Sequence, residues 1–261
     1  MPPAKRKKKS ATVVAVANQK GGVAKTTSVA SLGAAFAELG QRVLLVDLDA
    51  QACLTFSLGI DPDTVETSIH EVLTGRAELT DAILPCDDGV DLVPSTIDLA
   101  GAEAQLLGRP AREYVLSSAL EPALRDYDVV LLDCSPSLGV LTLNALTASQ
   151  GLIVPMQAEM LGHRGVGQLL DTVTDVKRIL NKKLSVLGIL PTMYDGRSNH
   201  SREVLEDVGE RYGVPVLSPP IPRTIRFAEA PAVGRSILST GRNTKGAKAY
   251  REVAKGILAS L

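Results

Sequence analysis

Residues 12–27 read TVVAVANQKGGVAKTT, and this stretch predicts a strand, a tight turn and the start of a helix. The run TVVAVA at 12–17 is short, apolar and rich in β-branched residues, which is typical of a buried strand. The alanine-rich stretch 26–39 ends before Gly40, as a helix commonly does. A second apolar strand, RVLLVD at 42–47, follows. Strand, turn, helix and strand form a βαβ unit, which implies parallel strands and a right-handed crossover.

The same alternation continues along the chain. Further apolar strands are predicted at 128–133 (DVVLLD), 151–155 (GLIVP) and 184–190. Helices are predicted between and after them, at 137–147, 165–180, 201–212 and 245–261. The pattern predicts an α/β fold, with a doubly wound and mostly parallel sheet flanked by helices.

Composition supports this fold and excludes several others. The chain has 261 residues, of which 45% are hydrophobic but only 3% aromatic, so the core must consist of small and branched aliphatic residues. No apolar run reaches the roughly 18 residues of a membrane span. Cys53, Cys86 and Cys134 are scattered, which argues against a disulfide framework, a zinc site or an iron–sulfur site. We expect a soluble, cytoplasmic protein with no membrane partner.

The formal net charge of −1 conceals a basic start. Five of the first nine residues are Lys or Arg, at positions 5–9. We expect residues 1–11 to form a disordered basic arm and residues 12–261 a single domain. The arm could contact nucleic acid phosphates or an acidic membrane surface, or it could act only as a solubilising tail.

The glycine-rich turn predicts a phosphate-binding loop. Gly21 and Gly22 allow the backbone to approach a phosphate closely, and the helix that follows presents its positive end. Lys25 would neutralise β- and γ-phosphates, and the Thr26 hydroxyl would coordinate Mg²⁺. ATP and Mg²⁺ are therefore the expected cofactors. The expected nucleotide contacts within the turn are Lys20, Gly21, Gly22, Val23, Ala24, Lys25, Thr26 and Thr27.

This turn departs from the ordinary G-x-x-x-x-G-K-[ST] pattern, because position 19 is Gln and an additional lysine, Lys20, precedes the two glycines. KGGVAKTT resembles the deviant Walker A motif of the ParA/MinD family. The resemblance extends to VDLDAQ at 46–51, VVLLDCSPS at 129–137, TMYDGRSN at 192–199 and IPRTIRFAEAP at 221–231. Together these segments look most like the short, chromosomally encoded, Soj-like partition ATPases.

The resemblance implies a homodimer that closes face to face around two ATP molecules. Lys20 would reach the partner's nucleotide while Lys25 serves its own, and Asp49 would orient the attacking water, so these three are the expected catalytic residues. Ala24 stands where many relatives carry Gly, and AQAC at 50–53 replaces the usual Pro-Gln-Gly-Asn. ATP binding is still expected despite these departures, but their effect on the switch stays open.

The metal site is expected at the carboxyl ends of the strands, where ligands of open α/β sheets collect. Asp47 and Asp49 follow one strand, and Asp133 ends another. Beside Thr26, three aspartates are expected at the metal. The resemblance implies that Asp49 helps the metal site, that Asp47 lies near the Mg²⁺ water shell, and that Asp133 holds a Mg²⁺-bound water. Helix capping is the alternative role for Asp47 and Asp49.

The resemblance also points to base and DNA contacts. Met193 and Pro222 match segments that contact the base, although Met193 could equally lie in the core. Arg197 and Arg226 are the expected contacts to DNA phosphates, with ordinary solvated charges as the alternative. Arg223 could extend the DNA patch or instead face the nucleotide; Arg202, Lys245 and Lys248 could also extend the patch.

The expected function is an ATP-dependent switch that dimerises on ATP and binds double-stranded DNA without sequence preference. It would hydrolyse ATP slowly under stimulation by a ParB-type partner, on the nucleoid, for chromosome partitioning. Three alternatives stay open: a MinD-like membrane-associated positioning ATPase, a metal-cluster carrier of the same superfamily, and a ParA-type ATPase that positions a plasmid or protein cargo.

Overall fold

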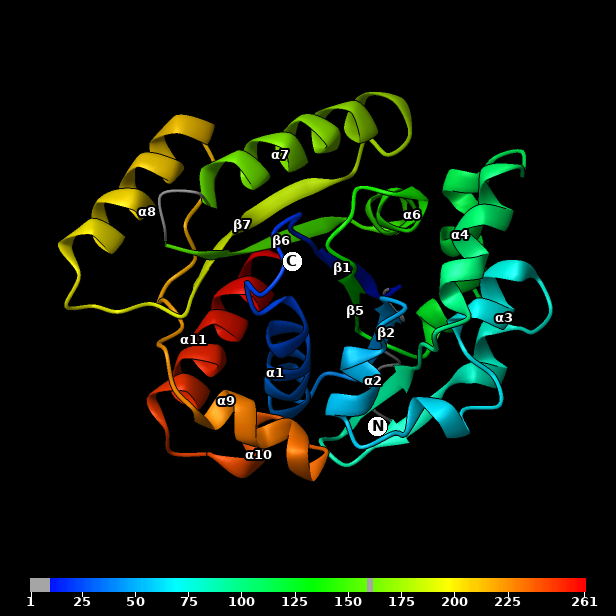
Figure 1. Cartoon of the computed structure of the whole chain (residues 1–261), viewed down its shortest axis with the longest axis horizontal. Coiled ribbons are helices and arrows are strands. Elements are labelled where there is room, and N and C mark those ends of the chain that lie inside the picture. Colours follow the sequence, from blue (N-terminus) through cyan, green and yellow to red (C-terminus); the bar gives the residue numbers. More distant parts are fainter. Residues whose placement is uncertain (1–9, 159–161) are drawn as a thin grey trace, which may run out of the picture.

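The computed structural model describes residues 10–158 and 162–261 (Figure 1). Its strands are β1 (Thr12–Val16), β2 (Val43–Leu48), β3 (Leu84–Cys86), β4 (Val90–Val93), β5 (Val129–Cys134), β6 (Gly151–Gln157) and β7 (Ser185–Thr192). The longer helices are α1 (Lys25–Glu38), α4 (Leu99–Leu107), α6 (Val140–Ala148), α7 (Gly162–Ile179), α8 (Asn199–Tyr212) and α11 (Lys245–Ser260). The shorter ones are α2 (Cys53–Ser57), α3 (Ile69–Thr74), α5 (Val115–Leu120), α9 (Arg226–Glu229) and α10 (Ile237–Thr240). Single turns of 3₁₀-helix lie at Pro62–Thr64, Leu79–Ala82, Arg112–Tyr114, Ala123–Arg125 and Ala230–Val233.

Among the described residues the strands form one sheet in the order β3-β4-β2-β5-β1-β6-β7. All neighbours run parallel except β3, which is antiparallel to β4. The fold class is therefore confirmed, and the five predicted strands correspond to β1, β2, β5, β6 and β7. The sequence prediction missed β3 and β4 because both are short, and β3 contains a proline, which normally counts against a strand.

The sheet has a hydrophobic core on each face. Along β1, Val13 and Ala15 point into the core covered by α3 to α8, while Val14 and Val16 point into the core covered by α1, α2, α10 and α11. The alternation follows from the period of two in a strand. Burial on both faces explains why these strands are almost wholly apolar.

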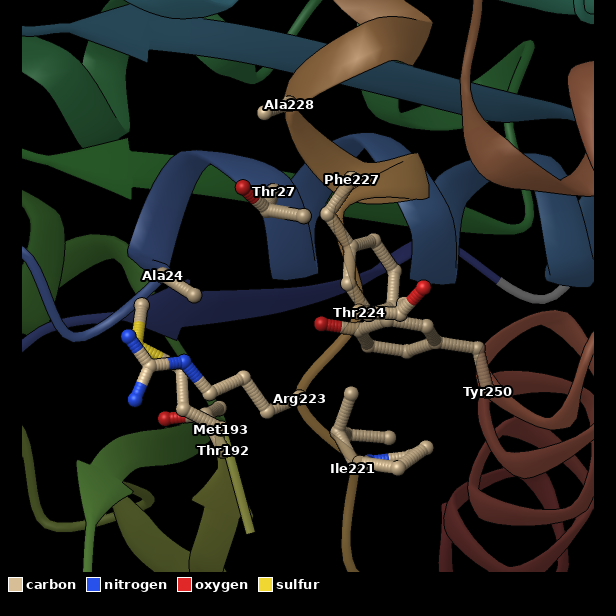
Figure 2. A pocket seen from close by; sticks show the side chains of 11 residues that line it. Ala24, Thr27, Thr192, Met193, Ile221, Arg223, Thr224, Phe227, Ala228 and Tyr250 are labelled. Atoms are coloured by element: carbon tan, nitrogen blue, oxygen red, sulfur yellow. The ribbon is translucent and has the colours of Figure 1, made fainter.

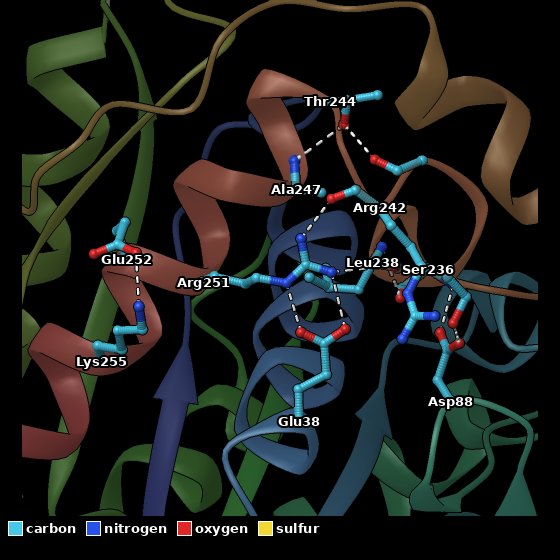
Figure 3. Close-up of polar contacts among 12 residues, drawn as sticks. Glu38, Asp88, Ser236, Leu238, Arg242, Thr244, Ala247, Arg251, Glu252 and Lys255 are labelled. Atoms are coloured by element: carbon cyan, nitrogen blue, oxygen red, sulfur yellow. Dashed lines mark hydrogen bonds and ion pairs between the residues drawn. The ribbon is translucent and has the colours of Figure 1, made fainter.

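Helix α1 lies very close to the sheet. A Cβ on Gly33 would come within 2.8 Å of a terminal methyl of Leu45, so a larger residue here would require Leu45 to shift. Helix α11 then packs beside α1, and Arg251 joins them by donating to both carboxylate oxygens of Glu38 at 2.6 and 2.9 Å (Figure 3). This packing fixes the helix whose start faces the phosphate-binding loop.

Of the predicted basic arm, residues 1–9 lie outside the described residues. Ser10 is exposed, whereas Ala11 is buried and its N–H donates to the Leu124 carbonyl at 2.8 Å. The division into an arm and one domain stays a prediction.

Candidate nucleotide-binding site

The phosphate-binding loop joins the carboxyl end of β1 to α1. Gly22 has φ +71°, a conformation that favours glycine, and neither it nor Gly21 has an atom within 4 Å of an added Cβ. Ala24 adopts the left-handed conformation at the start of α1, and no side chain caps the helix. The first-turn N–H groups are consequently left to an anion, and the first turn carries no acidic residue that would repel one.

Lys25 is buried at the first turn of α1. Its Nζ donates to the carbonyl oxygen of Lys20 at 3.2 Å, so the two lysines of the loop are linked through backbone. Burial lowers the pKa of the Lys25 ammonium, and the nearby Asp133, Cys134 and Asp49 oppose that shift. An ammonium drawn out of water in this way is well suited to pair with a phosphate.

Asp47 and Asp133 face each other across neighbouring strands, because the register pairs them in the β2–β5 ladder. Asp47 is completely buried, and both its oxygens are occupied. Its Oδ1 accepts from the Asp49 N–H at 3.1 Å, and its Oδ2 accepts from the N–H and hydroxyl of Thr55 at 2.9 and 2.8 Å. Burial raises the pKa of Asp47 to about 6, against the effect of these hydrogen bonds.

Asp133 is equally buried, but neither of its carboxylate oxygens has a hydrogen-bond partner within the described residues. Burial and then Asp47 raise the pKa of Asp133, while Thr26 and Lys25 act in the opposite direction. A buried carboxylate without partners is costly unless it meets a cation or water. This unsatisfied carboxylate close to Thr26 fits a Mg²⁺ site.

The described part of the chain has no cluster of three or more His, Cys, Asp or Glu side chains arranged to hold a metal. Mg²⁺ bound with a nucleotide commonly takes one or two protein ligands, phosphates and waters. Thr26 and Asp133 would be the residues that hold it. Asp47 also ties the end of β2 to Thr55 and to the backbone of Asp49, and its expected place near the Mg²⁺ water shell stays a prediction.

Asp49 is half-buried just beyond β2. Its Oδ1 accepts from the Gln51 N–H at 3.0 Å, which closes a small turn. Ala52 follows with φ +50° as the residue before α2, at one of the positions where the sequence departs from the family. Asp49 therefore lies on the turn between β2, which carries Asp47, and α2, which Asp47 holds through Thr55. Its role stays a prediction.

A cavity of about 340 Å³ opens beside the loop (Figure 2). It brings together Met193 and Pro222, the two residues predicted to contact the base. Their segments are joined because the Tyr194 N–H donates to the Ile221 carbonyl at 2.9 Å. The cavity is lined by Ala24, Thr27, Thr192, Met193, Ile221, Pro222, Arg223, Thr224, Phe227, Ala228 and Tyr250.

Sequence reasoning missed the aromatic floor of this cavity. Tyr250 on α11 is fully buried, its hydroxyl lies 2.9 Å from the Ser28 hydroxyl, and Phe227 meets its ring edge-on at 5.8 Å. The apolar face of the last helix was the available signal, but it indicated only packing. Arg223 lines the cavity, and its guanidinium lies beside Met193 and near Ala24; which of its two expected roles it has stays a prediction.

The two arginines predicted to bind DNA are exposed. Arg197, 92% exposed, pairs with Asp195 at 3.1 Å, and Arg226, 61% exposed, pairs with Glu229 at 2.8 Å. Arg197 lies between β7 and α8, and Arg226 begins α9. Their role in DNA binding stays a prediction.

A strand, a glycine loop and a helix, with a buried carboxylate suited to Mg²⁺ and a cavity beside the loop, define a P-loop nucleotide-binding protein. A family model described as an AAA domain matches residues 11–186. Soj of Bacillus subtilis, a sporulation initiation inhibitor protein, is 42% identical over 95% of this chain and 98% of its own. The chromosome-partitioning ATPase Soj of Thermus thermophilus is 45% identical over 94% and 95%. The chain belongs to the ParA/Soj family of ATPases.

A solved structure confirms the cofactors. The protein named cobyrinic acid a,c-diamide synthase from Mycobacterium smegmatis, with bound ADP and magnesium, has a TM-score of 0.86 and 57% identity over 95% of this chain and 94% of its own. The same protein has been solved with an ATP analogue and magnesium. ATP with Mg²⁺ is thus the cofactor pair of this nucleotide site. Within the described residues, no helix is both long and apolar enough to cross a membrane.

Proposed function

We propose that this chain is an ATP-dependent switch for chromosome partitioning. It dimerises when ATP binds, holds double-stranded DNA without sequence preference, and hydrolyses ATP slowly until a ParB-type partner stimulates it on the nucleoid, in the cytoplasm. The observation that carries this proposal is that the phosphate loop contains an additional lysine, Lys20, before its two glycines. Lys25, buried at the first turn of α1, would serve the chain's own nucleotide, so the additional lysine, Lys20, is best explained by a site shared between two subunits.

Three residues divide the work at such a site. Lys25 binds the phosphates in cis, Lys20 supplies positive charge to the partner's nucleotide, and Asp49 orients the attacking water. Bound ATP·Mg²⁺ supplies the phosphoanhydride bond. Because charge stabilisation from Lys20 would arrive only with the second subunit, hydrolysis would depend on dimerisation.

The exposed arginines suit weak, sequence-independent contacts to DNA. Arg197 and Arg226 each pair with a carboxylate only two or three residues away. Ion pairs between exposed side chains are weak, so a DNA phosphate can replace the carboxylate at little cost. The cargo could also be a plasmid or a protein cluster, since the same switch serves any of them.

A membrane role and a metal-cluster role receive less support from the structure. A MinD-like membrane role needs a lipid-facing terminal helix, but the apolar face of α11, including Tyr250 and Ile257, is buried against the domain. A metal-cluster carrier needs paired cysteines. Cys53 is exposed, Cys86 half-buried and Cys134 buried, and no described Cys, His, Asp and Glu side chains form a metal-binding cluster.

An ATP-dependent amide synthase is a second candidate, because the name of the 57% identical structure specifies one. Such an enzyme would consume ATP when offered a carboxylic acid substrate and an ammonia donor. Measuring ATP turnover with cobyrinic acid and glutamine, against turnover with DNA and a ParB-type protein, separates the two functions.

The decisive experiment is DNA binding followed by fluorescence anisotropy with ATP, with ADP and without nucleotide, at two salt concentrations. We expect binding only with ATP, weakening steeply as salt rises. Lys20→Ala should bind ATP but neither dimerise nor hold DNA. DNA affinity that is independent of nucleotide and salt would contradict the proposal, and a parallel liposome sedimentation tests the membrane role.

A further inference from the structure

Asn18 is the second residue after β1, and its side chain is buried. Its Nδ2 donates to the carbonyl oxygen of Pro155 at 2.7 Å, and its Oδ1 accepts from the N–H of Lys20 at 3.0 Å. The Asn18 side chain thus connects β6 to the backbone of Lys20. Nothing in the phosphate chemistry itself requires an asparagine here.

The bond to Pro155 takes the place of a missing rung between β1 and β6. These strands run parallel, and the last main-chain bond between them joins the Ala17 N–H to the Ile153 carbonyl at 3.2 Å. The next carbonyl in the pattern, two residues on, is that of Pro155. Because the Asn18 side chain satisfies it, the backbone can turn away from the sheet and still be tied to β6.

The peptide groups of Lys20 are held on both sides. Asn18 binds the N–H, and the Lys25 ammonium binds the carbonyl at 3.2 Å. A nucleotide phosphate would compete with that carbonyl for Lys25, whereas the bond to Asn18 involves no phosphate-binding group. Of these two side-chain contacts to the Lys20 backbone, only the one from Asn18 would therefore remain when nucleotide is bound.

The second half of the loop has its own anchor. The hydroxyl of Thr192, at the end of β7, donates to the Val23 carbonyl at 3.0 Å. Helix α7 also makes room for Asn18, since a Cβ on Gly165 would lie 3.2 Å from its Oδ1. The loop is consequently tied to β6 through Asn18 near Lys20, and to β7 through Thr192 near the nucleotide cavity.

We propose that Asn18 is a positioning residue for Lys20, which aims this lysine at the partner's nucleotide, while Thr192 positions the half of the loop that binds the chain's own nucleotide. The inference rests on the proposed function, because it assumes that Lys20 acts across the dimer. It predicts that the two anchors affect different steps.

The test compares Asn18→Ala with Thr192→Val in the full chain. Affinity is measured for a non-hydrolysable ATP analogue, and dimerisation is measured by light scattering with that analogue saturating. Asn18→Ala should weaken dimerisation at least about tenfold and change analogue affinity less than about threefold, since the Lys20 N–H and the Pro155 carbonyl lose their partner while Lys25 and Thr26 are untouched. Thr192→Val should weaken analogue affinity about five- to tenfold and leave dimerisation of the loaded protein near normal.

Asn18→Asp serves as the conservative variant and as insurance against misfolding of the alanine variant. It keeps the acceptor for the Lys20 N–H but cannot donate to Pro155, so its dimerisation should lie between that of Asn18→Ala and that of the unmodified chain. Normal dimerisation of Asn18→Ala, or an equal loss of analogue affinity and dimerisation in it, would overturn the inference. Lys20→Ala run beside them distinguishes the levels: if it dimerises normally, the proposed function itself is wrong.

Discussion

At the scale of single residues, Ala24 is the position whose meaning changed most between sequence and structure. In the sequence it is only an alanine where relatives often carry glycine. In the structure it has φ +63° and precedes the first turn of α1, a conformation that costs an L-residue roughly 1–2 kcal/mol. The residue is therefore strained, and its methyl group lines the nucleotide cavity.

Ala24→Gly should stabilise the nucleotide-free protein. Relief of the left-handed strain outweighs the extra freedom of glycine in the unfolded chain, leaving a net gain of about 1 kcal/mol and a rise in melting temperature of about 2–4 °C. Ala111→Gly is a matched control, because Ala111 has φ +52° in an exposed segment that does not line the cavity. Both should raise the melting temperature measured by calorimetry. No rise in either variant would contradict the strain argument.

The two buried aspartates should respond differently to neutralisation. Asp133→Asn should raise the Mg²⁺ concentration needed for half-maximal nucleotide binding by about tenfold or more, because it removes the carboxylate without hydrogen-bond partners among the described residues. Asp47→Asn should instead cost about 1–2 kcal/mol of stability, because an amide cannot accept all three hydrogen bonds from Asp49 and Thr55. Mg²⁺ titration and chemical denaturation measure these effects. If Asp47→Asn raised the required Mg²⁺ concentration and Asp133→Asn did not, Asp47 would be the residue that serves the metal.

At the scale of elements, the contact between α1 and α11 connects the phosphate loop to the aromatic floor of the cavity. The Glu38–Arg251 pair holds the far end of α1, and the Tyr250–Ser28 contact lies nearer its start. Asp88 adds another anchor close by, accepting from the Ser236 N–H at 2.6 Å and from the Ser239 hydroxyl (Figure 3). These contacts position the segment between the base cavity and the last helix.

Glu38→Gln should destabilise the protein by about 1 kcal/mol at pH 7, because it removes a two-pronged carboxylate–guanidinium pair that is only partly exposed. The hydrogen bond from Arg251 lowers the pKa of Glu38 below its usual value of 4.5. The stabilisation is thus fully present above pH 4.5 and is lost as pH falls through the folded-state pKa. Denaturation curves of the two proteins should converge in acid.

Glu252→Gln is the matched control for that measurement. Glu252 pairs with Lys255 within the same helix, with both side chains more than half exposed. Its neutralisation should change stability by less than about 0.5 kcal/mol. Equal effects of the two substitutions would mean that the α1–α11 pair contributes no more than an ordinary surface pair.

At the scale of the whole molecule, the proposed DNA contacts are two exposed arginines that do not line the nucleotide cavity. Replacing Arg197 and Arg226 together with alanine should lower DNA affinity at least about tenfold while ATP affinity stays unchanged. The slope of log affinity against log salt should become shallower, by about 0.9 for each DNA phosphate that the variant no longer binds. Arg178→Ala is a suitable control, because Arg178 is 72% exposed and paired with Asp175 on α7. A double variant with unchanged DNA affinity and slope would refute this assignment.

From the sequence alone, the β1–loop–α1 unit and the parallel sheet could be predicted, and Lys25 could be proposed as the lysine that binds phosphate. These depend on local patterns: apolar runs, glycines at a turn and an alanine-rich helix. It also pointed to Met193 and Pro222 through family resemblance, and the structure brings both to one cavity. The short strands β3 and β4 escaped prediction because so few residues carry no usable periodicity.

The difference between the two strand-end aspartates becomes visible only in the folded chain. In the sequence, Asp47 and Asp133 end similar apolar runs, VLLVD and VVLLD. Folding pairs them across β2 and β5, and the packing of α2 then brings Thr55 to Asp47 but no hydrogen-bond partner among the described residues to Asp133. Likewise, Tyr250 reaches the cavity from 222 residues beyond Ser28 in the chain. Such differences arise from long-range packing, about which local sequence patterns carry no information.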